Sequence, residues 1–257
     1  MGNEAIILRH LPAGEHDVLV DMLSTNHGLV KARARSARRS QRRFGGALEL
    51  GAIVRPSFSP RRNRAGMQLD ECLLVHSPKQ ARLDLCRFYQ LAYVLELALK
   101  TSMVGQPDQQ VYAAVRQYVS SLERFRPCHE QLVAWELALL GYMGQAVQWW
   151  PCVVTGAQPE GVSLDAGGAV ASTVRPRDYR PVSPSILRKF AEITRGDQPL
   201  FDNDEHVNAR QLINHIWQTI LERPVKSAAC IGPDAFSGPE LAPRSSVDGP
   251  GTRSGRE

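Results

Sequence analysis

The residues best suited to chemistry in this chain are cations, gathered near its N-terminal end. Between Lys31 and Arg64 the chain carries eleven lysines and arginines and a single acid, Glu49. The eleven are Lys31, Arg33, Arg35, Arg38, Arg39, Arg42, Arg43, Arg55, Arg61, Arg62 and Arg64. The formal net charge of the chain is only +5, so this local excess of ten leaves the other 223 residues at −5. A concentrated positive field attracts phosphate backbones, and the cluster therefore predicts a polyanionic partner.

The spacing of these cations indicates how they would meet phosphates. In residues 30–35, Lys31, Arg33 and Arg35 alternate with small apolar residues, which is the period of a β-strand with one core face and one binding face. Such a strand sets the cations about 6.8 Å apart, close to the spacing of phosphates along a nucleic-acid strand. The arginines of the 36–47 connection and of a hairpin tip at 60–66 would extend the track. A solvated basic loop without a partner is the alternative.

One aromatic residue lies within the basic segment. Phe44, between Arg43 and two glycines, could stack on a base, as aromatic side chains do in single-strand binders. It could equally plug the interior of a barrel. The sequence leaves both readings open.

Other chemistry has weaker support. The acidic pair Asp70-Glu71 and the group Asp202, Asp204 and Glu205 could bind a metal for nuclease chemistry, but the pair lies late in a strand and the group fits a helix N-terminus. Phosphate-cradling loops and common hydrolase motifs are missing. We therefore expect binding rather than catalysis, so the protein should not be an enzyme and should need no cofactor.

The five cysteines do not predict a disulfide framework or a zinc site. They are Cys72, Cys86, Cys128, Cys152 and Cys230. Their number is odd, none forms a C-x-x-C pair, and no histidine stands at metal-ligand spacing from them. They are expected to be reduced packing residues.

The chain is expected to be cytoplasmic. Its first twenty residues contain four charged side chains and no secretory apolar region, and no stretch reaches the roughly 20 apolar residues of a membrane span.

The periodicity predicts an α+β protein in two domains followed by a tail. Residues 1–78 read as five short strands near 4–10, 15–24, 28–35, 48–58 and 65–75, which suits a five-stranded OB-fold barrel, with an SH3-like barrel as the alternative. Residues 79–231 change to a helical period, with an irregular insertion or small strand pair at 145–182. Residues 232–257 are rich in Gly, Pro and Ser and predict a disordered tail.

Several short segments, taken together, resemble the RecO family of bacterial recombination mediator proteins. In the first domain they are residues 5–9 (AIILR), Gly14-Glu15, 27–30 (HGLV), 34–39 (ARSARR) and 44–48 (FGGAL). In the second they are residues 136–142 (ELALLGY) and 223–227 (RPVKS).

This resemblance implies an N-terminal OB domain, a C-terminal helical domain and work in DNA repair. It implies binding and annealing of single-stranded DNA, with double-stranded DNA also a ligand, and help from the partner RecR in placing RecA on DNA covered by single-strand-binding protein. Many relatives hold zinc with two C-x-x-C pairs. Here the first pair is reduced to Cys152 and Thr155 and the region 167–171 has none, so no zinc is expected.

The resemblance also implies a site on the helical domain for the acidic, apolar tail of single-strand-binding protein. Such a tail needs an apolar slot with a basic rim. The candidates are Arg124 and Arg126 for the rim and Leu132, Trp135 and Leu139 for the slot, although ordinary helical core is the alternative for those three.

The function that these observations favour is a non-enzymatic DNA-repair factor, working near the nucleoid, whose OB face holds single-stranded DNA by its backbone. Six neutralised phosphates would give a slope of log affinity against log salt of roughly −4. An RNA-binding, ribosome-associated OB module and a metal-dependent nuclease remain the alternatives.

Overall fold

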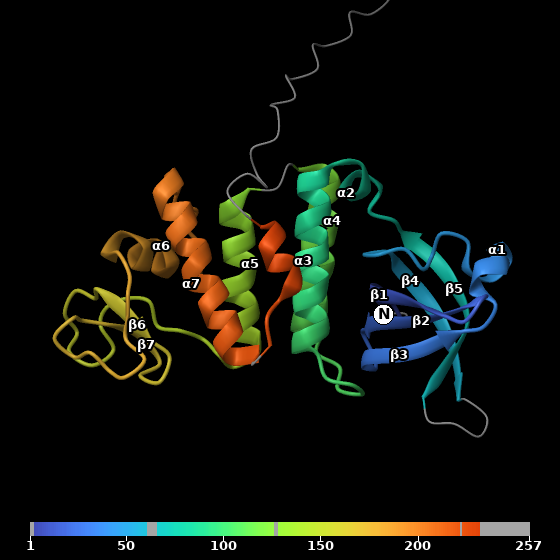
Figure 1. Ribbon diagram of the computed structural model, residues 1–257, viewed down its shortest axis with the longest axis horizontal. Helices are drawn as coiled ribbons and strands as arrows, with labels where there is room; N and C mark the ends of the chain where they lie inside the picture. The colour runs from blue at the N-terminus through green and yellow to red at the C-terminus, as the bar shows by residue number, and fades with distance from the viewer. Residues whose placement is uncertain (1–2, 61–65, 126–127, 222, 232–257) are drawn as a thin grey trace, which may run out of the picture.

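The computed structural model describes residues 3–60, 66–125, 128–221 and 223–231. Arg61, Arg62, Arg64, Arg126 and the predicted tail at 232–257 lie outside these residues. Within them, a β-barrel precedes a group of helices, which Figure 1 shows side by side. No helix in the described part of the chain is long and apolar enough to cross a membrane.

Five strands close the N-terminal barrel in the order β1-β2-β3-β5-β4. They are β1 (Ala5–Ala13), β2 (Asp17–Ser24), β3 (Gly28–Ala34), β4 (Ile53–Pro60) and β5 (Met67–His76). The predicted OB-type barrel is thus confirmed. The fourth strand begins later than predicted, because a turn in which Ala52 N donates to Glu49 O (3.0 Å) and Gly51 has a φ of 73° precedes Ile53.

The barrel interior is filled by the apolar positions of the alternating strands. Val30, Ala32 and Ala34 of β3 face inward, together with residues of all the other strands. Between β3 and β4 the chain forms a 3-10 turn, η1 (Ala37–Arg39), and the short helix α1 (Gln41–Phe44). Phe44 of α1 is 4% exposed and packs into the barrel core, so the plug reading of this ring is the one the structure supports.

The second part of the chain is helical. Its elements are α2 (Lys79–Leu83), α3 (Leu85–Thr101), α4 (Gln109–Arg124), α5 (His129–Tyr142), α6 (Pro184–Thr194), α7 (Asn203–Leu221) and η2 (Lys226–Cys230). Side-chain caps fix several starts, as expected for Asp and Ser. Asp108 accepts from the backbone N–H of Val111 (3.0 Å) and Ser183 accepts from that of Ser185 (3.3 Å).

A buried ion pair joins three of these helices. Glu136 of α5 is fully buried and accepts from both terminal nitrogens of Arg210 on α7, at 2.7 and 2.6 Å. Trp217 Nε1 (3.1 Å) and the hydroxyl of Tyr93 on α3 donate to the same carboxylate. The carboxylate therefore sets the register of α3, α5 and α7.

The segment at 145–182 is a small sheet rather than a strand pair. Its strands, β6 (Gly161–Ser163), β7 (Gly168–Val170) and β8 (Arg180–Pro181), are ordered β7-β6-β8. Cys152 is buried beside this sheet, and its sulfur accepts from the backbone N–H of Thr155 (3.5 Å) and of Ala171 (3.2 Å).

The barrel and the helices meet at one end of β3. Gly28 has a φ of 62°, and a Cβ there would lie 2.1 Å from the carbonyl oxygen of Gln106. Leu29 N donates to Met103 O at 3.0 Å, and Leu29 packs into the same hydrophobic core as the helices. The loop between α3 and α4 is therefore fixed against the barrel, and only glycine suits this contact.

Candidate nucleic-acid interface

The outer face of β3 carries the predicted cations. Lys31 and Arg35 are exposed and Arg33 is half-buried, whereas the alternate positions fill the barrel interior. Because β3 begins at Gly28 against the helices, Arg35, the first residue after the strand, lies beyond the end farther from them. The row of cations therefore runs away from the helical domain toward α1 (Figure 1).

The basic row continues from β3 into the following connection. Arg43 Nη2 donates to the carbonyl of Arg35 at 2.9 Å and Arg43 Nε donates to Ser40 Oγ at 3.0 Å, so α1 is tied to the end of β3. Arg39 and Arg42 are exposed on η1 and α1, and neither pairs with a carboxylate in the described residues. The guanidinium group of Arg38 donates to the carbonyl of Glu15 at 3.4 Å, and the backbone N–H of Arg38 donates to that of His16 at 3.1 Å.

Two carboxylates lie on this face and offset part of its charge. Arg33 Nε is 2.7 Å from Asp17 Oδ2, and Arg9 Nη2 on β1 is 2.6 Å from Asp21 Oδ2 on β2. The backbone N–H of Ser36 has the largest effect in lowering the pKa of Asp17; burial acts against it, and Arg33 and Arg35 lower it further. Lys31 on β3 and Arg35 just after it form no ion pair with a described carboxylate, although the charge of Arg35 acts on Asp17, so both can contact phosphates.

The strand register adds residues that the sequence analysis did not single out. Arg9, Asp21 and Lys31 are successive partners across β1, β2 and β3. The next outward row holds Leu11 and Leu19, each 44% exposed, and Arg33 beside them. Alternation within β1 and β2 could have indicated this row, but only the pairing shows that it adjoins the cations of β3.

Several predicted site residues are not available for binding. Of the two alternatives for Phe44, the candidate role in stacking on a base does not fit the structure, because its ring is buried in the barrel and Arg43 lies over it at 5.0 Å. Leu132, Trp135 and Leu139 belong to the helical core and line no open slot, and Trp135 Nε1 donates to Ala114 O at 3.2 Å. Only the exposed Arg124 remains of the described residues predicted for the partner site.

The acidic residues considered for a metal have structural roles. Asp70 accepts from Ser59 Oγ (3.1 Å) and from Gln68 Nε2 (2.9 Å), and Asp202 caps α7 by accepting from Glu205 N (2.8 Å). No group of three His, Cys, Asp or Glu residues in the described chain could hold a metal ion.

Burial tends to raise the pKa of Cys152, but hydrogen bonds from Thr155, Val154 and Ala171 prevail and lower it to about 7.

Comparison with known proteins accounts for both parts of the chain. The family model described as "Recombination protein O N terminal" matches residues 1–78, and "Recombination protein O C terminal" matches residues 82–229. The chain is similar to the DNA repair protein RecO of Myxococcus xanthus (strain DK1622), with 29% identity over 230 residues, 88% of this chain and 94% of that protein.

Two further relatives are similar to this chain. DNA repair protein RecO of Anaeromyxobacter dehalogenans (strain 2CP-C) is 33% identical over 198 residues, 74% of this chain and 78% of that protein. That of Bifidobacterium longum (strain DJO10A) is 25% identical over 240 residues, 89% of this chain and 97% of that protein. The barrel, the helical domain and these matches together show that the chain belongs to the RecO family of DNA repair and recombination proteins.

Proposed function

We propose that this protein binds single-stranded DNA along the outer face of β3 and anneals complementary strands. The observation that carries the proposal is the row of exposed cations that form no ion pair with a described carboxylate, on an OB-type barrel: Lys31 on β3, and Arg35, Arg39 and Arg42 in the connection that follows it. Exposed cations bind the phosphates of a nucleic acid with little dependence on its base sequence, and this binding releases the counterions of the phosphates.

The apolar part of the same face suits annealing. Among the described residues of the barrel no Phe, Tyr or Trp is exposed, and Leu11 and Leu19 form the exposed apolar pair beside Arg33. Aromatic platforms hold bases by about 1–3 kcal/mol each. Leucines hold them more weakly, so a strand bound by its phosphates keeps its bases ready to pair.

The helical domain is proposed to serve protein partners. Family membership supports RecR as a partner and, through it, the placement of RecA on DNA covered by single-strand-binding protein in the cytoplasm. With Leu132, Trp135 and Leu139 buried, a site for the tail of single-strand-binding protein would use other apolar residues near Arg124. The proposed role is mediation of strand exchange and involves no turnover of a substrate.

A strand-annealing assay with and without single-strand-binding protein tests this proposal. We expect the protein to accelerate pairing of complementary oligonucleotides, and to do so on strands precoated with single-strand-binding protein. The double variant Lys31→Gln/Arg35→Gln should lose most of this activity. Equal activity of the variant, or tighter binding of matched RNA than of DNA in competition, would contradict the proposed site or the proposed substrate.

A further inference from the structure

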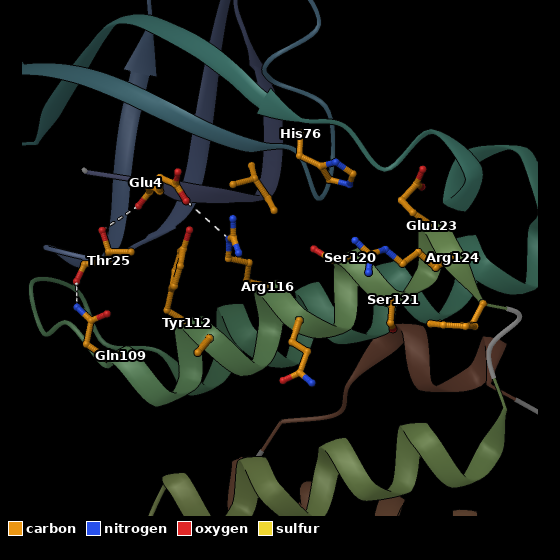
Figure 2. Close-up of a pocket in the computed structure, with 14 residues that line it drawn as sticks. Glu4, Thr25, His76, Gln109, Tyr112, Arg116, Ser120, Ser121, Glu123 and Arg124 are labelled. Atoms are coloured by element: carbon orange, nitrogen blue, oxygen red, sulfur yellow. Dashed lines mark hydrogen bonds and ion pairs between the residues drawn. The ribbon is translucent and has the colours of Figure 1, made fainter. Parts of the chain in front are cut away.

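A large groove separates the barrel from helix α4, away from the outer face of β3. Its volume is about 1110 Å³, and Figure 2 shows the side chains of α4 facing the ends of the barrel strands across it. This volume exceeds the roughly 300–1000 Å³ of small-molecule pockets, and the groove is open. The dimensions suit a segment of an extended polymer.

Two buried polar atoms in this groove are incompletely hydrogen-bonded. His76 Nε2 has no hydrogen-bond partner in the described chain, and Tyr112 Oη, on a residue that is 5% exposed, lies beside the donor Arg116 but has no acceptor for its own proton. Buried polar groups are nearly always satisfied, so such atoms mark a place where a ligand atom is missing. The hydroxyl proton of Tyr112 needs an acceptor.

The acidic side chains of the groove already have hydrogen-bond or ion-pair partners, whereas Arg124 has no ion pair within the described chain. Glu4 lies 3.5 Å from Arg55 Nη2 and 3.7 Å from Arg116 Nε, and Glu123 accepts from the backbone N–H of Gln80 at 2.8 Å. Arg124 is exposed and forms no ion pair in the described residues. The acids are thus already engaged, and the groove retains unused donors.

The donors of the groove line up along one helix. Arg116, whose Nε lies 3.7 Å from Glu4, and Arg124, which has no ion pair in the described chain, are eight residues apart on α4, which places them about 12 Å apart along its axis, with Ser120 between them (Figure 2). Arginine guanidinium groups, serine and tyrosine hydroxyls and an imidazole N–H all donate to oxyanions. The repeated donors favour a chain of phosphates over a single anion.

We propose that this groove holds the phosphate backbone of a second nucleic-acid strand while the face of β3 holds the first. The inference rests on the proposed annealing function. It explains why the two candidate surfaces lie at different parts of the barrel, β3 running away from the helices and the groove facing them. Annealing requires two strands to be close together, and one protein with both surfaces supplies that proximity.

The test combines crosslinking with binding and annealing measurements. A benzophenone amino acid placed at Gln117, an exposed residue of the groove, should crosslink to a labelled oligothymidylate. Arg116→Gln/Arg124→Gln should abolish that crosslink and slow annealing about tenfold, while affinity for the first strand changes less than twofold. Arg195→Gln, which removes one positive charge at the C-terminal end of α6, should change neither.

Tyr112→Phe separates ligand binding from folding. If the hydroxyl has no partner even when DNA is bound, its removal from a buried position leaves binding unchanged and stability unchanged or higher. If it donates to a phosphate, the variant stays folded and crosslinks several-fold less strand. The second result supports the proposal and the first contradicts it.

The outcomes also separate this inference from the proposed function. Loss of binding in Lys31→Gln/Arg35→Gln with normal annealing in the groove variant overturns the groove and leaves the β3 face. Loss of all binding in the groove variant alone overturns the β3 face as the primary site. A crosslink that forms with an acidic peptide and not with oligothymidylate would assign the groove to a protein partner and overturn the proposal.

Discussion

Replacing Lys31 and Arg35 with glutamine should change the salt dependence of single-stranded DNA binding by a defined amount. Four exposed cations of the β3 and α1 face, Lys31, Arg35, Arg39 and Arg42, have side chains without an ion pair or hydrogen bond in the described residues, whereas Arg38 and Arg43 donate to carbonyl groups. At about 0.7 per phosphate for single strands, four contacts give a slope of log affinity against log salt of about −3, and the double variant reduces its magnitude by about 1.4. Arg61, Arg62 and Arg64 lie outside the described residues, so the difference between the proteins is the quantity to test.

The assay is fluorescence anisotropy with a labelled oligothymidylate at a series of salt concentrations. Between about 50 and 200 mM salt, four contacts predict an affinity loss of about 50-fold and two contacts a loss of about 7-fold. The variant should unfold at nearly the same temperature as the wild type, because both side chains are exposed and exposed charges contribute little to stability.

Arg33→Gln is the informative comparison on the same strand. Arg33 is already paired with Asp17 at 2.7 Å, so its loss should alter the slope less than the loss of Lys31. Parallel salt plots for the wild type and for Lys31→Gln/Arg35→Gln would refute the electrostatic account of this face. A larger change for Arg33→Gln than for Lys31→Gln would show that the ion pair opens to bind DNA and that the count of free cations is wrong.

Three further predictions concern stability. Glu136→Gln should lower the free energy of unfolding by about 3–5 kcal/mol, measured by urea denaturation, because the buried guanidinium of Arg210 loses its charged partner. Gly28→Ala should lower the thermal midpoint, with a cost of about 2 kcal/mol or more, since a Cβ would meet Gln106 in a left-handed backbone conformation. Burial acts to raise the pKa of Glu205, but its hydrogen bonds lower this pKa to about 2. The stabilisation by the Glu205 carboxylate is therefore fully present above the usual pKa of 4.5 and is lost as the pH falls toward 2. Glu205→Gln should accordingly make the free energy of unfolding fall less steeply with pH in this range.

Much of the barrel was predictable because its signals are local. Alternation at residues 30–35 predicted which side of β3 faces inward. The first strand was predicted to end near residue 10, yet β1 continues to Ala13 because its hairpin with β2 pairs Ala13 with Asp17. The length of a hairpin depends on both of its strands, so the residue pattern of one strand alone does not predict where the pairing ends.

The candidate site was predictable only in part, for the same reason. Residue types identified Lys31 and Arg35 as cations on a strand, but partners distant in sequence decide which cations are free: Asp17 reaches Arg33 from sixteen residues away. The environment of Phe44 likewise depends on how α1 packs against the barrel. The sequence therefore left base stacking and burial in the barrel equally open, and the structure places the ring in the barrel core. The groove beside α4 has no signature in the sequence, since its donors come from β5 and α4 and meet only when the domains dock.

The docking of the two domains determines where the two proposed surfaces lie. The close approach of Gly28 to Gln106 holds the end of β3 against the loop that leads into α4, so the strand that carries Lys31 and the helix that carries Arg116 are joined at this contact. If both surfaces hold DNA, their separation is set by this junction rather than by a flexible linker. A protein built in this way would hold two strands at a constant distance, which lowers the entropic cost of bringing them together for pairing.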